Sequence, residues 1–240
     1  MHQQKAAIVT GASQGIGAGL VEAFLKRNYN VVANSRHITK TNPFPASANL
    51  ALVDGDIGDP KTAARIVDTA VSRFGRVDVL INNAGFLISK PFTEYTTEDL
   101  NALVATTLAG FLYVSQLSVK QMLRQKSGSI VNISTTYVGH PIAGVPVTVQ
   151  VMAKGSLDAV TRALAIEYAK DGIRANTVAL GVIKTPMHEP ETYESLKGLH
   201  PLGRMGEIKE VVDAVLFLTD ATFTTGETLH VDGGAHAGKW

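Results

Sequence analysis

The sequence contains no cysteine among its 240 residues. This excludes disulfide bonds and thiolate metal sites, fits a reducing compartment, and leads us to expect no metal centre. No apolar run approaches the roughly 20 residues that span a bilayer, and residues 1–5 lack the long apolar stretch of a secretory signal. A net charge of only +1 favours neither nucleic acid nor a membrane as partner. These absences predict a soluble, cytoplasmic protein.

Short apolar runs divide the chain into regular units. Apolar residues make up 45% and charged residues 18% of the chain, a globular balance, and 240 residues suffice for a sizeable core. Runs that are apolar throughout are typical of parallel strands buried on both faces. We predict strands at Lys5–Thr10, Asn30–Ser35, Leu50–Val53, Val77–Asn82, Ser129–Ile133, Ile173–Ala179 and Thr228–Val231.

Between these runs, apolar residues recur at helical spacing. Helices are predicted at Ile16–Arg27, Lys61–Phe74, Asp99–Gln125, Val151–Lys170 and Glu207–Leu218. This alternation predicts a Rossmann-like, doubly wound parallel α/β sheet of about seven strands, with helices on both faces, in one domain over residues 1–240. Two segments interrupt the pattern. We expect Thr41–Ser47 to be a surface loop and Pro186–Pro201 to be a mobile lid.

A glycine-rich turn lies between the first predicted strand and the first helix. Gly11, Gly15 and Gly17 have the spacing G-x-x-x-G-x-G. A strand that turns sharply into a helix, with backbone close to a pyrophosphate, requires positions without side chains. The helix N-terminus then offers free N–H groups and the positive end of its dipole to the anion. The turn therefore predicts a dinucleotide site, with a tight turn that binds nothing as the alternative.

The end of the second strand indicates which dinucleotide is bound. An acidic side chain there would accept hydrogen bonds from both ribose hydroxyls and repel a 2′-phosphate. This chain has Ser35 and Arg36 instead. Because a guanidinium pairs with phosphate through a planar fork, we expect NADP(H) to be preferred over NAD(H). The alternative is a solvated surface arginine.

Three segments together carry a resemblance to a known family. They are the glycine turn at Thr10–Gly17, the run Asn82–Gly85 after the fourth strand, and a helical stretch containing Gln150 and Lys154. In this order they resemble the short-chain dehydrogenase/reductase family. The tail Gly226–Gly234 looks like the family's last strand, so the resemblance spans nearly the whole chain. It implies a nicotinamide cofactor, a small-molecule substrate, and a homo-oligomer, either a tetramer or a dimer.

The resemblance also assigns cofactor-binding positions. The segment Leu180–Thr185 is similar to the family stretch that holds the nicotinamide amide, except that Leu180 replaces a proline. The turn after the third strand would contact adenine, and the run after the fourth would lie beside the adenine ribose. The implied contacts are Gly11, Ser13, Gly15, Ile16, Gly17, Ser35, Arg36, Asp56, Ile57, Asn83, Ala84, Gly85, Lys154, Gly181, Ile183 and Thr185.

The catalytic positions depart from the family pattern. The family has a tyrosine, its proton donor, four residues before the lysine, and this chain has Gln150 before Lys154. Residues four apart share a helix face. In the family, the lysine binds the nicotinamide ribose and lowers the tyrosine pKa. A glutamine amide has no proton to give at neutral pH, so Lys154 is expected to hold cofactor while Gln150 supplies hydrogen bonds only.

Two further family positions are also altered. Counting back from Gly139 places Thr136 at the serine that polarises the substrate carbonyl, with Thr135 possible if the count slips by one residue. An asparagine on the central helix corresponds to Thr107, which leaves the family's water relay in doubt. The hydroxyls of Thr135 and Thr136 are alternatively simple caps of the backbone after a strand.

Four other side chains are candidates for the substrate pocket. Tyr137 and His140 follow the fifth strand, and His188 and Tyr193 belong to the expected lid. A histidine titrates near neutrality and is a reasonable acid, although a loop histidine is more often simply polar. Tyr137 is expected to be a pocket wall.

These patterns predict an NADP(H)-dependent oxidoreductase. It would move a hydride to or from a small carbonyl, quinone-like or conjugated enone substrate, because such acceptors differ in their need for a proton donor. The alternative is a catalytically silent NADP(H)-binding sensor or partner subunit, which Gln150 and Thr107 favour. A third possibility is that Gln150 is an engineered replacement in an ordinary dehydrogenase. The substrate and the direction of the reaction stay open.

Overall fold

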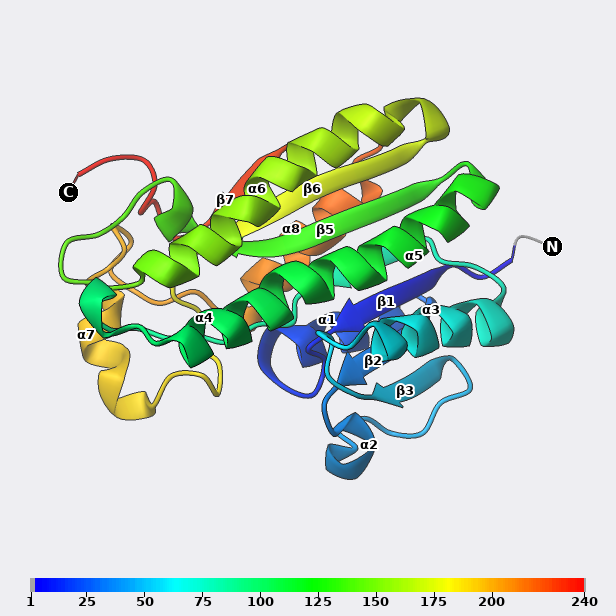
Figure 1. The fold of residues 1–240 in the computed structure, drawn as a ribbon, viewed down its shortest axis with the longest axis horizontal. Coiled ribbons are helices and arrows are strands. Elements are labelled where there is room, and N and C mark those ends of the chain that lie inside the picture. The colour runs from blue at the N-terminus through cyan, green and yellow to red at the C-terminus, as the bar shows by residue number, and fades with distance from the viewer. Residues whose placement is uncertain (1–2, 240) are drawn as a thin grey trace.

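A seven-stranded parallel sheet forms the centre of the molecule (Figure 1). The computed structural model describes residues 3–239. The strand order is β3-β2-β1-β4-β5-β6-β7. Successive strands are added toward one edge from β1 to β3 and toward the other edge from β4 onward, and all of them are parallel. The strands are β1 (Ala6–Thr10), β2 (Asn30–Ser35), β3 (Leu50–Asp54), β4 (Val79–Asn82), β5 (Gly128–Thr135), β6 (Ile173–Leu180) and β7 (Thr228–Val231). The expected Rossmann-like α/β fold is confirmed.

Helices cover both faces of the sheet (Figure 1). One layer contains α1 (Gly15–Lys26) and α8 (Ile208–Asp220), whose apolar faces pack on one side of the strands. The other contains α3 (Pro60–Phe74), α5 (Gly110–Gln125) and α6 (Thr148–Tyr168). Two large apolar cores result, one on each side of the sheet, and a small third cluster contains Leu103, Val149 and Ala153. Burial on both faces explains the apolar run Ala6–Val9 of β1.

Short helices appear where the sequence suggested only loops. The helix α2 (Ile38–Thr41) precedes the expected surface loop, and both Ile38 and Phe44 are buried against the α1 layer. Within the expected lid, a 3-10 turn at Pro190–Thr192 leads into α7 (Tyr193–Lys197). A four- or five-residue helix is too short for sequence periodicity to reveal, because it completes little more than one turn.

The predicted helix Asp99–Gln125 is composite. It consists of α4 (Thr97–Leu103), a π-helical segment at Val104–Ala109, and α5. A capping box between Thr96 and Asp99 starts it, which explains why it begins before Asp99. π-helical turns are rare and frequently lie at functional sites, and this one faces the carboxyl ends of β1 and β4.

The stretch Thr97–Gln125 is the one helical span among residues 3–239 that is long and apolar enough to cross a membrane, by length and composition alone. In this structure its α5 part packs on α3 and on the sheet, with Val114 and Met122 fully buried. The apolar composition is accounted for, on that face, by the core of the protein.

Candidate active site

The turn from β1 into α1 is built by glycines that protein atoms approach closely. Gly11 and Gly15 have positive φ values of 63° and 57°, a conformation that glycine adopts without strain. A Cβ on Gly17 would lie 2.2 Å from the Gly11 carbonyl oxygen, and one on Gly11 would lie 2.7 Å from Ala84 Cα. At Gly11 and Gly17, the protein's own backbone therefore requires glycine, in addition to any ligand.

The N-terminus of α1 is left without a cap. Within residues 3–239, Gln14 makes no side-chain capping bond and the first turn carries no acidic residue. In contrast, Asp59 caps α3, and Glu207 with Glu210 caps α8. The first N–H groups of α1 and the positive end of its dipole are thus available to an anion. Ser13 and Ile16 lie beside them, both half-buried.

Thr10 and Asn83 fix the run after β4 against the glycine turn. The Asn83 side chain donates to the Thr10 and Gly11 carbonyls at 2.9 and 3.1 Å. The Thr10 hydroxyl accepts from the Asn83 and Ala84 N–H groups, at 3.0 Å each. Asn83 therefore acts on the turn through its side chain, while Gly85 continues, exposed, toward Lys154.

Arg36 and Asp56, the two charged residues expected near the adenosine of the cofactor, are both exposed. Arg36 follows β2 with an exposed side chain, beside half-buried Ser35. The Asp56 carboxylate accepts from the Gly58 N–H at 2.8 Å and so braces its own turn. Ile57 is 6% exposed and packs on Gly110 at the start of α5. Arg36 is thus accessible to a phosphate, whereas Ile57 is largely a core residue.

The segment after β6 leaves two of its backbone N–H groups without an acceptor among the described residues. The N–H of Gly181 donates to Val231, that of Val182 to His200, and that of Lys184 to Gly206. The N–H groups of Ile183 and Thr185 have no acceptor among the described residues. Ile183 lies where the family resemblance places the nicotinamide amide. Thr185, half-buried, lies opposite Gly15, with its Cβ 3.5 Å from where a Gly15 side chain would begin.

Lys154 is a buried cation at the carboxyl end of β5. Its Nζ donates to the Ile133 carbonyl at 2.7 Å and would lie 3.3 Å from a Cβ on Gly85. Burial lowers the Lys154 pKa from 10.5 to about 8, and the negative charge of Asp158 opposes this shift. The structure therefore brings Lys154, Gly85 and the end of β5 together.

Gln150 lies one helical turn before Lys154 on α6 and is 7% exposed. Its Oε1 atom is buried and has no hydrogen-bond partner within residues 3–239. Leaving a buried amide oxygen unpaired costs about 1–3 kcal/mol. An acceptor in this condition favours a ligand that donates a hydrogen bond to it.

The hydroxyl groups of Ser134, Thr135 and Thr136, at the end of β5, point in different directions. The Thr136 hydroxyl is 1% exposed and donates to Asp232 at 2.6 Å. The Thr135 hydroxyl is only half-buried and makes a long bond of 3.3 Å to the Leu180 carbonyl. Ser134 faces α6, and its hydroxyl lies 3.5 Å from the Lys154 carbonyl. Thr136 is thus held away from Lys154, while Thr135 stays accessible.

Sequence reasoning passed over Ser134. Asn132, two residues earlier, donates to Thr161 on α6, so alternate residues of β5 face this helix. Because side chains alternate along a strand, Ser134 points to the same side as Asn132, toward α6 and Lys154. The alignment of Gly139 with the family pattern selected Thr136 instead. Its neighbour Asp158 has a raised pKa, mainly because of burial.

The four expected pocket residues lie in two groups. Tyr137, whose pKa burial raises, follows β5 together with exposed His140. The His140 ring stands 5.9 Å from the ring of His236 in the C-terminal segment. His188 and Tyr193 are half-buried in the segment that contains α7, and burial lowers the His188 pKa.

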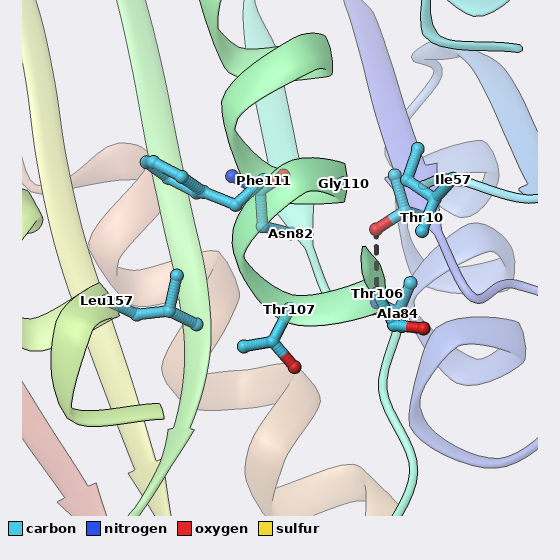
Figure 2. Close-up of a pocket in the computed structure, with 9 residues that line it drawn as sticks. All are labelled: Thr10, Ile57, Asn82, Ala84, Thr106, Thr107, Gly110, Phe111 and Leu157. Carbon is cyan, nitrogen blue, oxygen red and sulfur yellow. Dashed lines mark hydrogen bonds between the residues drawn. The ribbon is translucent and has the colours of Figure 1, made fainter. Parts of the chain in front are cut away.

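A small cavity of about 10 Å³ lies beside Thr107. Figure 2 shows Thr107, from the π-helical segment, between Leu157 on one side and Thr106 with Ala84 on the other, where the Thr10 hydroxyl accepts a hydrogen bond from the Ala84 N–H. Such a volume admits roughly one water molecule. The remaining lining residues are Ile57, Asn82, Gly110 and Phe111.

Comparison with known proteins identifies the family. The chain matches the family described as enoyl-(acyl carrier protein) reductase over residues 11–236. It is 34% identical over 246 residues to glucose 1-dehydrogenase of Gluconobacter oxydans, which covers 96% of this chain and 91% of that protein. The chain belongs to the short-chain dehydrogenase/reductase family. It is therefore an oxidoreductase of the short-chain type.

Solved structures of this short-chain dehydrogenase/reductase family have the same fold. ElxO with NADP bound has a TM-score of 0.91 and 31% identity, over 98% of this chain and 100% of that one. The 3-ketoacyl-(acyl-carrier-protein) reductase from Brucella melitensis, complexed with NADH, has a TM-score of 0.90 and 27% identity, over 97% and 98% of the two chains. These two neighbours hold nicotinamide dinucleotides of both kinds.

The described residues of this short-chain dehydrogenase/reductase fit a nicotinamide dinucleotide at three separate points. The uncapped start of α1 suits a pyrophosphate. The unpaired Ile183 N–H suits a carboxamide oxygen. The Lys154 ammonium, buried next to Gly85, has donors left for ribose hydroxyls beyond its bond to Ile133. All three lie at the carboxyl edge of the sheet, where such folds bind ligands.

Proposed function

We propose that this protein is an NADP(H)-dependent oxidoreductase with a non-standard proton-transfer site. Its substrate is a small carbonyl, quinone-like or conjugated enone compound. Residues 1–240 act as one domain that carries both the cofactor site and the substrate site. We propose further that it works in the cytoplasm as a homo-oligomer, either a tetramer or a dimer.

Each part of the site has a separable task. The start of α1 neutralises the pyrophosphate, and Arg36 pairs with the 2′-phosphate. Lys154 holds the nicotinamide ribose through its buried ammonium. Ile183 N–H orients the carboxamide. When bound, the cofactor supplies or accepts the hydride.

The substrate oxygen lies against Gln150 and Thr135 in this proposal. Thr135 is chosen over Thr136 because the Thr136 hydroxyl is buried and engaged by Asp232. The Gln150 amide offers both a donor and an acceptor but no acidic proton. A hydride acceptor that tolerates developing negative charge, such as a quinone or enone, depends least on a proton donor in the site.

One observation carries the proposal. Gln150 is buried one helical turn before Lys154, and its Oε1 is without a partner in the part of the chain that the structure describes. Lys154 itself is retained as a buried cation. This combination supports a site that holds the cofactor and a hydrogen-bonding substrate, and that lacks a phenol to donate the proton.

The same residue favours a second candidate function. A protein that binds NADP(H) but performs no chemistry needs no proton donor, and both Gln150 and Thr107 depart from the family's relay. Such a sensor or partner subunit still requires Lys154 and the α1 site. The two candidates therefore share a cofactor and differ in turnover.

Turnover with a substrate panel separates them. Ketones, quinones and enones are each mixed with NADPH, and the absorbance of the reduced nicotinamide is followed. We expect quinones or enones to be consumed faster than simple ketones. A Lys154→Ala variant serves as the control for background reduction. Consumption indistinguishable from that of the variant, with NADPH still bound by the wild type, establishes the sensor instead.

Arg36 is expected to set the cofactor preference. Because it is exposed and no carboxylate lies beside it on β2, NADPH should bind more tightly than NADH. A charge-assisted hydrogen bond contributes about 1.5–3 kcal/mol, so Arg36→Asp should weaken NADPH about tenfold to a hundredfold and spare NADH. Fluorescence titration measures both. Arg124→Asp, at an exposed arginine near the end of α5 and remote from β2's carboxyl end, is the matched control. Equal affinity for the two cofactors in the wild type would refute the assignment.

A further inference from the structure

His200 is a buried histidine that follows α7 and is 4% exposed. Its Nε2 accepts a hydrogen bond from the Val182 backbone N–H at 2.9 Å. An accepting Nε2 carries no proton, so the network assigns the neutral ring with its proton on Nδ1. A side chain from the end of the expected lid is thus bonded to the segment that leaves β6.

Glycines allow the ring to reach this position. A Cβ on Gly181 would lie 2.7 Å from His200 Nε2, and one on Gly233 would lie 3.1 Å from His200 Cβ. The imidazole is therefore wedged between the exit of β6 and the turn after β7. Any side chain at Gly181 would push the ring away from Val182.

The bond acts on the residue next to the proposed nicotinamide contact. Val182 also gives its carbonyl to the Gly206 N–H, and Lys184 donates to the Gly206 carbonyl. Together with His200, these bonds fix the peptide units on both sides of Ile183. A peptide unit is planar, and only two dihedral angles at each residue set its orientation relative to the next unit. Bonds that fix the peptide units around Ile183 therefore also fix the direction in which the unpaired Ile183 N–H points.

We propose that His200 is a positioning residue for the nicotinamide, which holds the Gly181–Ile183 backbone so that the Ile183 N–H points at the carboxamide. The inference rests on the proposed function. It also ties the lid to the cofactor, since His200 ends the segment that contains α7.

Protonation of His200 would release the segment. Protonated Nε2 is a donor and would face the donor N–H of Val182. Burial lowers the His200 pKa, while the Lys197 carbonyl and the Asp232 carboxylate raise it and Arg204 lowers it. The neutral, accepting form therefore prevails at pH 7, and nicotinamide positioning should weaken as the pH falls below the His200 pKa.

Three variants and two ligands test the proposal. His200→Leu removes the acceptor, and His200→Gln retains one on a side chain of similar reach. Met205→Leu alters another buried side chain and leaves the His200 acceptor in place. NADPH reports on the whole site. Adenosine 2′,5′-bisphosphate, which lacks the nicotinamide, reports only on the adenosine end. Amide hydrogen exchange at Val182, in the protein without ligand, reports on the bond itself.

We expect His200→Leu to weaken NADPH about tenfold, as for the loss of one buried hydrogen bond, and to leave the bisphosphate unchanged. Val182 exchange should quicken in His200→Leu and stay slow in His200→Gln and Met205→Leu. Wild-type NADPH affinity should fall at acid pH relative to the bisphosphate, and His200→Gln should not show this fall.

Two results overturn the inference while leaving the proposed function standing. One is an equal loss of both ligands in His200→Leu, which indicates a merely structural role. The other is unchanged NADPH affinity in that variant. A wild-type protein that binds neither ligand refutes the proposed function, and Val182 exchange then still decides whether His200 holds this segment.

Discussion

Replacing Lys154 by methionine should abolish turnover and make the protein more stable. The two effects have one cause, because the ammonium that holds the ribose is buried in a site that penalises its charge. Burial lowers the Lys154 pKa to about 8. Since one pKa unit corresponds to about 1.4 kcal/mol, keeping the charge at pH 7 costs the folded state about 3 kcal/mol. Methionine has a similar length and no charge.

The loss of function should be large. Lys154 positions the nicotinamide ribose, and a misplacement of about 1 Å costs about a hundredfold in rate. We therefore expect at least a hundredfold fall in kcat/KM with the preferred acceptor. The gain in stability should be smaller than the full penalty, because methionine leaves the Ile133 carbonyl without its donor. An increase of about 1 kcal/mol corresponds to about 2–4 °C in Tm for a chain of this size.

The pH dependence distinguishes this explanation from better packing alone. The pKa of Lys154 is depressed in the folded state, so the folded protein releases this proton before the unfolded chain does. The penalty is complete below pH 8 and is relieved as the pH rises from about 8 toward 10.5. The stability difference between Lys154→Met and wild type should therefore shrink between pH 7 and pH 10. Lys170→Met, at an exposed position, is the control. Urea unfolding at pH 7 and pH 10 measures the difference in unfolding free energy between Lys154→Met and wild type. A difference that does not change with pH contradicts the explanation from the buried charge.

The sheet was accessible to sequence analysis because its strands are buried on both faces. Every residue of β1 is buried, and such a run has few other interpretations once helices flank it. β5 extends beyond its predicted end at Ile133, because Ser134 and Thr135 are polar residues inside a strand. The carboxyl ends of the strands have polar residues because they line the candidate ligand site. A search for apolar runs therefore ends the predicted strand too early.

The tight turns of the candidate site could be predicted from the sequence, whereas the directions of its hydroxyl groups could not. Glycine positions and the Asn83 run follow local backbone geometry, which sequence encodes directly. The direction of the hydroxyls after β5 depends on Asp232, which lies 96 residues from Thr136 in the chain. The bond from His200 to Val182 spans 18 residues across an irregular segment. Neither contact leaves a periodic signal, so only the folded chain reveals them.

Gln150→Tyr should create or raise ketone reduction. Gln150 is buried on the same face of α6 as Lys154, and a phenol placed there has a cation one helical turn away. A nearby positive charge lowers the pKa of a tyrosine from its usual value near 10. A positioned general acid contributes about 10² to 10⁴ in rate. We therefore expect a ketone that the wild type barely reduces to be reduced about a hundredfold faster or more.

Gln150→Phe and Gln150→Ala make the result interpretable. Phenylalanine has the ring but no hydroxyl, so any gain that it shares with tyrosine comes from pocket shape and argues against proton donation. Alanine removes the amide, and if Gln150 hydrogen-bonds the natural substrate, kcat/KM should fall by a factor equivalent to about 1–3 kcal/mol. Steady-state assays with NADPH across a pH series measure all three variants. If Gln150→Tyr leaves ketones unreactive while the quinone or enone activity falls, the pocket is shaped for another acceptor, because a competent acid beside Lys154 would then be present without a carbonyl in reach.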